Sequence, residues 1–349
     1  MRKILLPISF IYWIVLKIRH KLYDWNIFRS RRFDFPIICV GNLRLGGTGK
    51  TPHTDYLIRL LETRYRVAVL SRGYGRKTKG FVVGDATATH ETIGDEPMLY
   101  LTKHPDIQVC VDENRVEGVE RMLRQATPPQ VILLDDAFQH RKIQAGLNLL
   151  LTEYHELYSE DCLLPAGNLR DIRDAARRAD CIIVSKTPDD LDENAQNEIR
   201  KRLKINDNQN LYFSSIVYDD LQVLNAEAEK NPSADADGVL VFCGIANPAP
   251  LIAHLQTRHQ NVELLHFADH HNFSEHDIQS ILKRFESMEG ERKIIVTTEK
   301  DAMRLTKSAY LCQLESAPLF VAPIHIRFHQ EEKFNEAIEQ YVRQNLNHR

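Results

Sequence analysis

Closely spaced cysteines are absent from this chain of 349 residues. Its six cysteines are scattered, and no two of them form a Cys-x-x-Cys pair. A chain of this length buries a large core without disulfide staples, so nothing in the spacing supports a disulfide scaffold. We expect reduced thiols that pack as small hydrophobic side chains, as is typical of a cytosolic protein.

Net charge is also low, at −3 at pH 7, and this predicts no general attraction to nucleic acid. The average conceals a basic segment, because residues 1–32 hold eight Lys or Arg and a single acidic residue, Asp24. The same segment is rich in large apolar side chains between Ile4 and Ile18. Positive charge and hydrophobicity therefore coincide at the N-terminus.

A long uninterrupted apolar run is missing as well. A helix that crosses a bilayer needs about 18–20 apolar residues, and the run within residues 1–32 is shorter. No small-residue cleavage site follows it, as a secretory signal would require. We interpret the segment as an interfacial helix whose apolar face enters the headgroup region while Lys and Arg meet anionic lipid. A helix packed on the protein's own core is the alternative.

The segment that carries most information is a glycine-rich loop. It consists of Gly46, Gly47, Thr48, Gly49, Lys50 and Thr51. Apolar residues 36–40 before it predict a buried strand, and the apolar positions within residues 56–61 after it have helical spacing. A strand, a loop that ends in Gly-Lys-Thr and a helix, in this order, are typical of P-loop nucleotide-binding proteins.

The residue types in this loop suit a bound nucleotide. Glycines let backbone N–H groups turn toward phosphate oxygens, and the helix N-terminus adds partial positive charge. Lys50 would contact the β- and γ-phosphates of ATP, and the Thr51 hydroxyl would bind Mg²⁺. Arg44 occupies the position of the first glycine in the full pattern, so a chance glycine turn is the alternative.

Short apolar segments alternate with helical stretches along the chain. This alternation predicts an α/β fold with a parallel sheet and helices on both faces. The expected strands of the core are residues 36–40, 66–71, 107–111, 131–136, 148–151 and 181–184. Nearly all the chemically distinctive residues follow such strands, and α/β sheets bind ligands at the carboxyl ends of their strands.

Five segments are expected along the chain. They are a basic N-terminal segment 1–32, a P-loop core 33–224, a linker 225–237, a smaller C-terminal α/β lobe 238–328 and a terminal helix 329–349. The linker is expected because its hydrophobicity is low. The lobe is expected from four further apolar strands, at residues 239–243, 262–267, 293–297 and 319–323.

Paired carboxylates end the apolar run 131–136. In the Walker B arrangement, an Asp at a strand tip holds Mg²⁺ directly or through water. Many strands end in Asp, and it is the preceding P-loop that makes this interpretation specific. Because neighbouring side chains of an extended chain point apart, we expect one of Asp135 and Asp136 to face the metal and the other a different partner.

Three further polar clusters admit a structural as well as a functional interpretation. Asp95, in a Gly-Asp-Glu-Pro motif, suits the first turn of a helix. Arg170 lies in a loop, where it would meet phosphate oxygens or pair with Asp171. The adjacent His270 and His271 lack Cys or carboxylate partners at the spacing of a zinc site.

Together, these motifs resemble the tetraacyldisaccharide 4′-kinases, the lipid A kinases of Gram-negative bacteria. In chain order they are Gly-Gly-Thr-Gly-Lys-Thr-Pro (46–52), Ser-Arg-Gly-Tyr-Gly (71–75), Gly-Asp-Glu-Pro (94–97), Asp-Asp-Ala-Phe-Gln-His (135–140), Leu-Pro-Ala-Gly-Asn-Leu-Arg (164–170), Asp-His (269–270) and Thr-Glu-Lys-Asp-Ala (298–302). Each motif alone is unspecific, but seven in one order are hard to obtain by chance.

The resemblance implies transfer of the ATP γ-phosphate to the 4′-hydroxyl of a tetraacyldisaccharide 1-phosphate, with Mg²⁺ as the metal. It also implies a P-loop core, a smaller C-terminal lobe that closes over the site and an N-terminal helix that binds the membrane. The enzyme is then expected to be a peripheral protein at the cytoplasmic face of the inner membrane, and a monomer.

By the same resemblance, Asp95 is the base for the 4′-hydroxyl, His270 assists it, and Lys50 serves the transferred phosphate. Arg170 is expected to line the nucleotide–metal site. The implied metal ligands are Thr51, Asp135, Asp136 and Asp171. The family commonly has Glu at the last of these positions, and the shorter Asp reaches less far.

The alternative from another class is a membrane-associated nucleotide-switch ATPase of the partitioning or metallochaperone type, which shares the glycine-rich loop. Partitioning ATPases place a Lys just before the first glycine of the pair, and here that residue is Leu45. Metallochaperones usually carry Cys or His clusters near the loop, which this sequence lacks. The guanine-binding Asn-Lys-x-Asp motif is also missing, since residues 185–189 do not supply it.

Overall fold

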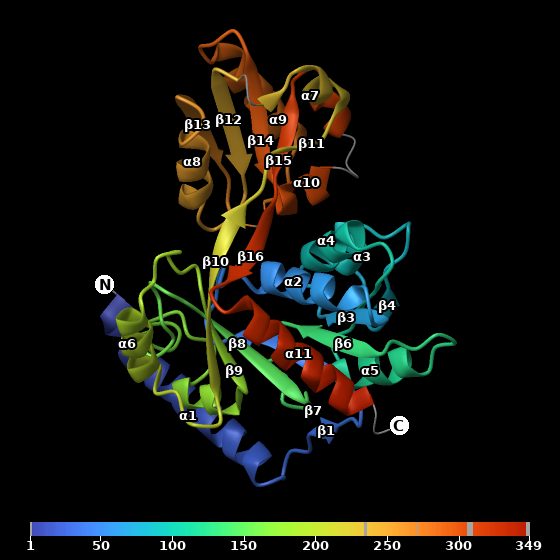
Figure 1. Cartoon of the computed structure of the whole chain (residues 1–349), viewed down its shortest axis with the longest axis vertical. Coiled ribbons are helices and arrows are strands. Elements are labelled where there is room, and N and C mark those ends of the chain that lie inside the picture. The colour runs from blue at the N-terminus through green and yellow to red at the C-terminus, as the bar shows by residue number, and fades with distance from the viewer. Residues whose placement is uncertain (1, 234–235, 270, 306–309, 347–349) are drawn as a thin grey trace. The chain divides into compact units, whose positions relative to one another are not determined.

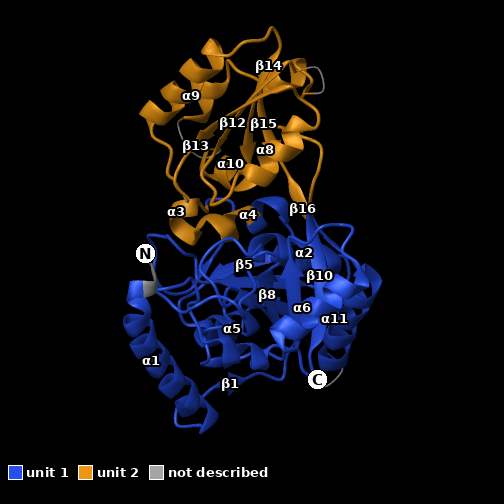
Figure 2. Ribbon diagram, turned by 90° about the vertical axis from the view of Figure 1, so that its left-hand side faces the viewer, with its two compact units in different colours: residues 1–87, 100–216, 326–349 blue, residues 88–99, 217–325 orange. Residues whose placement is uncertain are grey.

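Each of the two units of this chain is built around a sheet of its own (Figure 2). The computed structural model describes residues 2–233, 236–269, 271–305 and 310–346 (Figure 1). Unit 1 contains residues 1–87, 100–216 and 326–349, and unit 2 contains residues 88–99 and 217–325. The α/β fold class expected from the sequence is confirmed in both units.

The main sheet of unit 1 has nine strands in the order β16-β10-β9-β8-β2-β6-β3-β5-β4. Neighbours from β10 to β5 pair in parallel, and β4 pairs antiparallel to β5. The strands are β2 (Ile37–Asn42), β3 (Val67–Ser71), β4 (Val82–Val83), β5 (Gln108–Val111), β6 (Val131–Asp135), β8 (Leu147–Glu153), β9 (Cys181–Ser185), β10 (Asn210–Tyr218) and β16 (Ile324–Phe328). Short strands β1 (Arg31–Arg32) and β7 (Ile143–Gln144) pair separately.

Helices cover both faces of this sheet, and strands β2, β3 and β6 are therefore buried along their whole length. On one face, Leu57 of α2 and Ile338 of α11 join the core, so the terminal helix packs on unit 1. On the other face, Leu16 of α1, Val119 of α5 and Ile199 of α6 do so. These helices are α1 (Leu6–Asp24), α2 (Lys50–Glu62), α5 (Arg115–Leu123), α6 (Glu193–Leu203) and α11 (Glu331–Leu346).

Helix α1 has two different faces. A narrow stripe is buried against unit 1 and consists of Ser9, Leu16, His20 and Tyr23. Eight large apolar side chains of this helix are exposed, and they are Leu6, Ile8, Phe10, Ile11, Trp13, Ile14, Val15 and Ile18. No helix within the described residues is long and apolar enough to span a bilayer.

Unit 2 contains a five-stranded sheet in the order β11-β15-β14-β12-β13. Only β11 pairs antiparallel within this sheet. The strands are β11 (Gln222–Val223), β12 (Gly238–Cys243), β13 (Asn261–His266), β14 (Lys293–Thr298) and β15 (Leu319–Ala322). The helices outside the sheet are α3 (His90–Ile93), α7 (Ala226–Lys230), α8 (Ala249–Gln256), α9 (Glu275–Ser287) and α10 (Glu299–Leu305), and α4 (Asp95–Lys103) begins in this unit.

Several elements of the structure differ from the expected segments, and three of them have a clear local reason. Strand β10 was not expected, because Ser214 and Ser215 interrupt its apolar run. Strand β16 was not expected either, since His and Arg alternate with its apolar residues. The segment 225–237, expected as a linker, contains helix α7, because the Asn225 side chain accepts a hydrogen bond from Ala228 N at 3.0 Å and caps it.

We predict that Gly41→Ala destabilises unit 1 by about 1–3 kcal/mol, the usual cost of overpacking a core. A Cβ at Gly41, on β2, would lie 2.5 Å from the Cβ of Phe138, and neither backbone can move without disturbing the sheet. Urea unfolding of the full chain measures the effect.

Gly47→Ala is the matched control, because a Cβ there would meet no atom within 4 Å. We expect its free energy of unfolding to stay within about 0.5 kcal/mol of the wild-type value. Equal losses in the two variants would contradict the proposed packing of Gly41 against Phe138.

Candidate active site

The glycine-rich loop connects β2 to α2 in the middle of the unit 1 sheet. Gly46 and Gly49 have positive φ angles, of 101° and 83°, which glycine adopts at little cost. A Cβ at Gly46 or Gly47 would meet no atom within 4 Å, so this stretch of backbone borders open space. Such a loop before a helix N-terminus is a cradle for phosphate oxygens.

Side chains at the ends of neighbouring strands hold this loop in place. Asn42, the last residue of β2, donates from Nδ2 to the Thr48 hydroxyl at 2.7 Å. Ser185, at the end of β9, donates to the Thr48 carbonyl at 2.9 Å. The loop is therefore fixed before any ligand arrives, which lowers the ordering cost of binding.

His53 fixes the other end of the loop, where α2 begins. Its Nδ1 lies 2.7 Å from the Gly49 carbonyl oxygen, and its Nε2 lies 2.9 Å from the Ser214 hydroxyl. Because the carbonyl only accepts, Nδ1 carries the proton and Nε2 accepts from Ser214. Burial lowers the pKa of His53 to about 4, so this neutral form is the stable one.

Asp136 follows β6 directly and adopts a left-handed backbone, with a φ of 49°. Its carboxylate accepts from Arg170 Nη1 at 2.9 Å and from Nη2, and it lies 3.9 Å from Lys50 Nζ. Burial alone would raise its pKa, but the Arg170 hydrogen bonds and the charge of Lys50 hold the pKa of Asp136 below its ordinary value. The carboxylate is therefore ionised and beside the loop lysine.

Asp135 and Asp136 have different partners, because Asp135 ends the extended strand β6 whereas Asp136 adopts a left-handed backbone. Asp135 is buried at the tip of β6, and its Oδ2 lies 3.4 Å from the hydroxyl of Ser71 at the end of β3. Thr51, in the first turn of α2, is buried as well. These hydroxyl and carboxylate oxygens are the donor type that Mg²⁺ prefers.

No group of three or more His, Cys, Asp or Glu side chains in the described part of the chain could hold a metal ion by itself. Mg²⁺ usually takes one or two carboxylates together with substrate phosphates, so such a cage is not needed. Thr51, Asp135 and Asp136 offer oxygen atoms of the kind that suits such an ion.

Unit 2 carries Asp95, the first residue of α4. Arg304 of α10 donates to Asp95 Oδ2 at 2.5 Å and to Asp301 Oδ1 at 3.0 Å. Thr298, at the end of β14, donates to the same Asp301 at 2.7 Å. Two of the sequence motifs, Gly-Asp-Glu-Pro and Thr-Glu-Lys-Asp, are thus joined through one buried arginine.

His270 lies outside the described residues. His271, its neighbour, stacks on Phe267 with ring centroids 4.9 Å apart, and its Nε2 lies 3.0 Å from Asp277 Oδ2. His271 is therefore engaged inside unit 2 by an aromatic ring and by the first turn of α9.

The whole chain is similar to proteins of one family. Residues 1–343 match the family described as tetraacyldisaccharide-1-P 4′-kinase, or LpxK. The tetraacyldisaccharide 4′-kinase of Bacteroides thetaiotaomicron is 45% identical over 356 residues, which cover 98% of this chain and 94% of the relative. That of Porphyromonas gingivalis is 40% identical over 341 residues and 95% of each chain. The chain belongs to this family.

A solved structure supports the same conclusion. It is described as the "apo" form of LpxK from Aquifex aeolicus in complex with ATP. It matches this family member with a TM-score of 0.74 and 28% identity, covering 98% of this chain and 99% of that chain. The resemblance seen in the seven motifs is confirmed, and the nucleotide-switch alternative is not favoured.

Asp171 is the last of the four metal ligands that the resemblance implies. Its fully buried carboxylate lies 2.6 Å from His20 Nε2 and 3.6 Å from Arg178 Nη2, and it accepts from Ile172 N at 2.8 Å. None of these partners belongs to the glycine-rich loop. Oδ1 of this short side chain is thus engaged by helix α1 and by Ile172 N, whereas the distance from Oδ2 to Arg178 is longer than a hydrogen bond. The expected metal role of Asp171 stays a prediction.

Three residues of these clusters were missed in the sequence. They are His20, His53 and Arg304, whose partners Asp171, Ser214 and Asp95 are 151, 161 and 209 residues away. The Arg304 position follows Thr-Glu-Lys-Asp by one turn of helix, which is the one local signal that could have pointed to it.

We predict that Asp277→Asn destabilises unit 2 by about 1–2 kcal/mol at pH 7. Asp277 accepts from Ser274 N at 2.8 Å and from its hydroxyl at 2.7 Å, in a capping box. Burial opposes ionisation, but these bonds and His271 lower the pKa of Asp277 to about 2. Urea midpoints of both proteins measure the difference.

The direction of the pH dependence follows from the lowered pKa of Asp277. The ionised Asp277 stabilises the folded chain fully at pH values above the ordinary carboxyl pKa. This stabilisation is lost as the pH falls toward 2, because Asp277 is protonated at a higher pH in the unfolded chain than in the folded chain. The gap between wild type and variant should therefore narrow from pH 5 to pH 3. A gap that is constant over this range would contradict the assigned partners.

Proposed function

We propose that this family member phosphorylates the 4′-hydroxyl of a tetraacyldisaccharide 1-phosphate, with ATP as the phosphate donor and Mg²⁺ as the metal, in lipid A biosynthesis. The observation that carries this function is the family match over residues 1–343. The glycine-rich loop and the charged groups beside it supply the parts that phosphoryl transfer needs, which are positioning and charge neutralisation.

In unit 1, we assign the nucleotide phosphates to the loop of residues 46–51. Backbone N–H groups of the loop and Lys50 would hold the phosphates, and Arg170 would orient Asp136 beside them. Thr51, Asp135 and Asp136 would hold Mg²⁺. A bound ion would supply positive charge against the negative charge that develops on the phosphates during transfer.

In unit 2, we assign the base for the acceptor hydroxyl to Asp95. The bond from Arg304 fixes the position of the Asp95 carboxylate, and this carboxylate would take the hydroxyl proton. As the 4′-oxygen bonds to the γ-phosphorus, the bond from that phosphorus to the bridging oxygen of ADP breaks, and the hydroxyl proton passes to Asp95. We assign an assisting role to His270.

We also propose that α1 attaches the enzyme to the cytoplasmic face of the inner membrane as a peripheral protein, and that the enzyme is a monomer. Eight large apolar side chains of α1 are exposed. Lys17 and Lys21 lie over the rings of Trp13 and Trp25, each 5.6 Å from the centroid, as in an interfacial belt. An acylated substrate resides in a bilayer, so a helix on its surface would place the enzyme beside it.

We predict that Asp95→Ala lowers transfer of labelled γ-phosphate to a tetraacyldisaccharide 1-phosphate by about 100-fold or more, the scale of a lost general base. The assay uses detergent-dispersed substrate and the full chain. ATP binding should be retained, because the loop of unit 1 is unchanged.

Glu96→Gln is the matched control, since Glu96 is the next residue of the same helix and pairs with Lys300 at 3.1 Å. Its transfer rate should fall far less. If both variants lose activity equally, Asp95 acts in the folding of α4 and not as the base. If the wild type binds ATP and transfers nothing, the proposed reaction is wrong.

We predict that the pair of changes Ile11→Asp and Ile18→Asp weakens binding to vesicles containing anionic phosphatidylglycerol by about tenfold or more. Both side chains are more than half exposed, so the fold of unit 1 should be unaffected. Co-sedimentation with vesicles at low and high salt measures the binding.

Val223→Asp is the control, because Val223 is a similarly exposed apolar residue on β11 of unit 2. It should bind vesicles as the wild type does. Equal vesicle binding by the α1 variant and the wild type would refute the membrane role of this helix.

A further inference from the structure

The buried stripe of α1 is more polar than anchoring requires. Ser9 donates to the Leu163 carbonyl at 2.9 Å and accepts from Ala166 N at 3.0 Å. His20 is only 6% exposed, although its ring is polar. Burying such groups costs free energy unless each finds a partner, so a helix that served only as an anchor would present apolar residues here.

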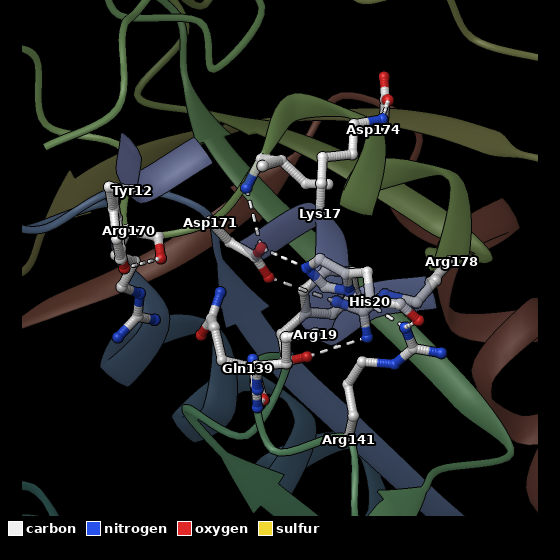
Figure 3. A network of polar contacts seen from close by, with 12 residues as sticks. Tyr12, Lys17, Arg19, His20, Gln139, Arg141, Arg170, Asp171, Asp174 and Arg178 are labelled. Carbon is white, nitrogen blue, oxygen red and sulfur yellow. Dashed lines mark hydrogen bonds and ion pairs between the residues drawn. The ribbon is translucent and has the colours of Figure 1, made fainter. Parts of the chain in front are cut away.

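Two polar contacts of α1 end on consecutive residues, Arg170 of the proposed nucleotide site and Asp171 beside it (Figure 3). Tyr12 donates from its hydroxyl to the Arg170 carbonyl at 3.0 Å. His20 Nε2 lies 2.6 Å from Asp171 Oδ1. Arg141 donates to His20 Nδ1 at 3.1 Å, and because a guanidinium only donates, His20 donates its Nε2 proton to Asp171.

The same peptide segment is bonded to the chain that leads into the glycine-rich loop. Arg170 N donates to the Leu43 carbonyl at 2.8 Å, and Leu45 N donates to the Asn168 carbonyl at 2.9 Å. The backbone of Arg170 is thus held by α1 on its carbonyl side and by residues next to the loop on its amide side.

A second series of hydrogen bonds connects α1 to the residues beside the glycine-rich loop. Arg19 donates to the Gln139 carbonyl at 2.8 Å, and Gln139 donates from Nε2 to the Asn42 carbonyl at 2.8 Å. The Asn42 side chain also accepts from Arg170 at 2.5 Å and donates to Thr48 of the loop. Both series therefore converge on Arg170 and Asn42.

We propose that α1 is a positioning element of the nucleotide site, in which Tyr12 and His20 set the place of Arg170 and thereby of Asp136 and the loop. This inference rests on the proposed assignment of the loop to ATP. A bidentate guanidinium–carboxylate pair tolerates little displacement, so a loosened 170–171 segment weakens nucleotide binding without any change at the loop itself. The helix that meets the lipid thus also completes the site for ATP.

The test uses the full chain in detergent without lipid substrate and measures the affinity of a fluorescent ATP analogue with Mg²⁺. Tyr12→Phe, which removes a single hydroxyl, should weaken binding by about tenfold, the scale of one lost hydrogen bond in a positioned site. His20→Leu should weaken it at least as much. His20→Gln should restore most of the affinity, because a glutamine amide can donate to Asp171 and accept from Arg141.

The transfer assay gives a second readout. The KM for ATP should rise in Tyr12→Phe and His20→Leu, while vesicle binding stays at the wild-type level, since the exposed apolar face is intact. Lys17→Gln is the matched control on the same helix, because Lys17 pairs with Asp174 and reaches neither Arg170 nor Asn42. Its ATP affinity should equal that of the wild type.

Lys50→Ala separates failure of this inference from failure of the proposed site. If Lys50→Ala loses nucleotide binding and Tyr12→Phe does not, the positioning role of α1 is overturned while the site stands. If His20→Gln and His20→Leu lose affinity and thermal stability together, α1 serves packing alone and the inference is overturned. If Lys50→Ala binds the analogue normally, the site assignment is wrong, and the inference falls with it.

Discussion

The pair formed by Arg170 and Asp136 is the interaction on which the proposed nucleotide site depends. Asp136 adopts a left-handed backbone that a non-glycine residue rarely takes, and it places a carboxylate 3.9 Å from Lys50. Such a conformation persists only where the surroundings hold it, and here the bidentate bonds from Arg170 do so. The parallel sheet supplies the frame, because β2 and β6 are neighbours and bring their carboxyl ends together.

Helix α1 shows how one amphipathic segment serves two environments. Its exposed apolar side chains suit a bilayer surface, where they are removed from water only on attachment. Its buried stripe instead contacts polar groups of unit 1, including one oxygen of the Asp171 carboxylate, a charge that is costly to bury without a partner. Of the two interpretations of the N-terminal segment that the sequence left open, packing on the protein's own core is seen in the buried stripe, and the interfacial role of the exposed face stays a prediction.

Much of the fold could be predicted because its signals are local. Ten of the strands are short apolar runs, and the glycine-rich loop stands between a strand and a helix, as its pattern demands. Strands β10 and β16 could not be predicted, because Ser, His and Arg interrupt their apolar residues. Their strand conformation depends on pairing with neighbouring strands of the sheet and not on a local apolar pattern. Helix α7 could not be predicted either, because one capping residue, Asn225, is enough to start a short helix in a polar segment.

The sequence by itself determined three features of this protein. They are the glycine-rich loop at 46–51, the paired carboxylates at 135–136 and the order of seven motifs that is typical of the family. Local backbone rules suffice for these, since glycine content and strand ends need no distant partner. Only the tertiary structure decided which groups meet. Asp171 pairs with His20 across 151 residues, and Asp95 meets Arg304 across 209, because side-chain partners so remote are chosen by how helices pack and not by spacing along the chain.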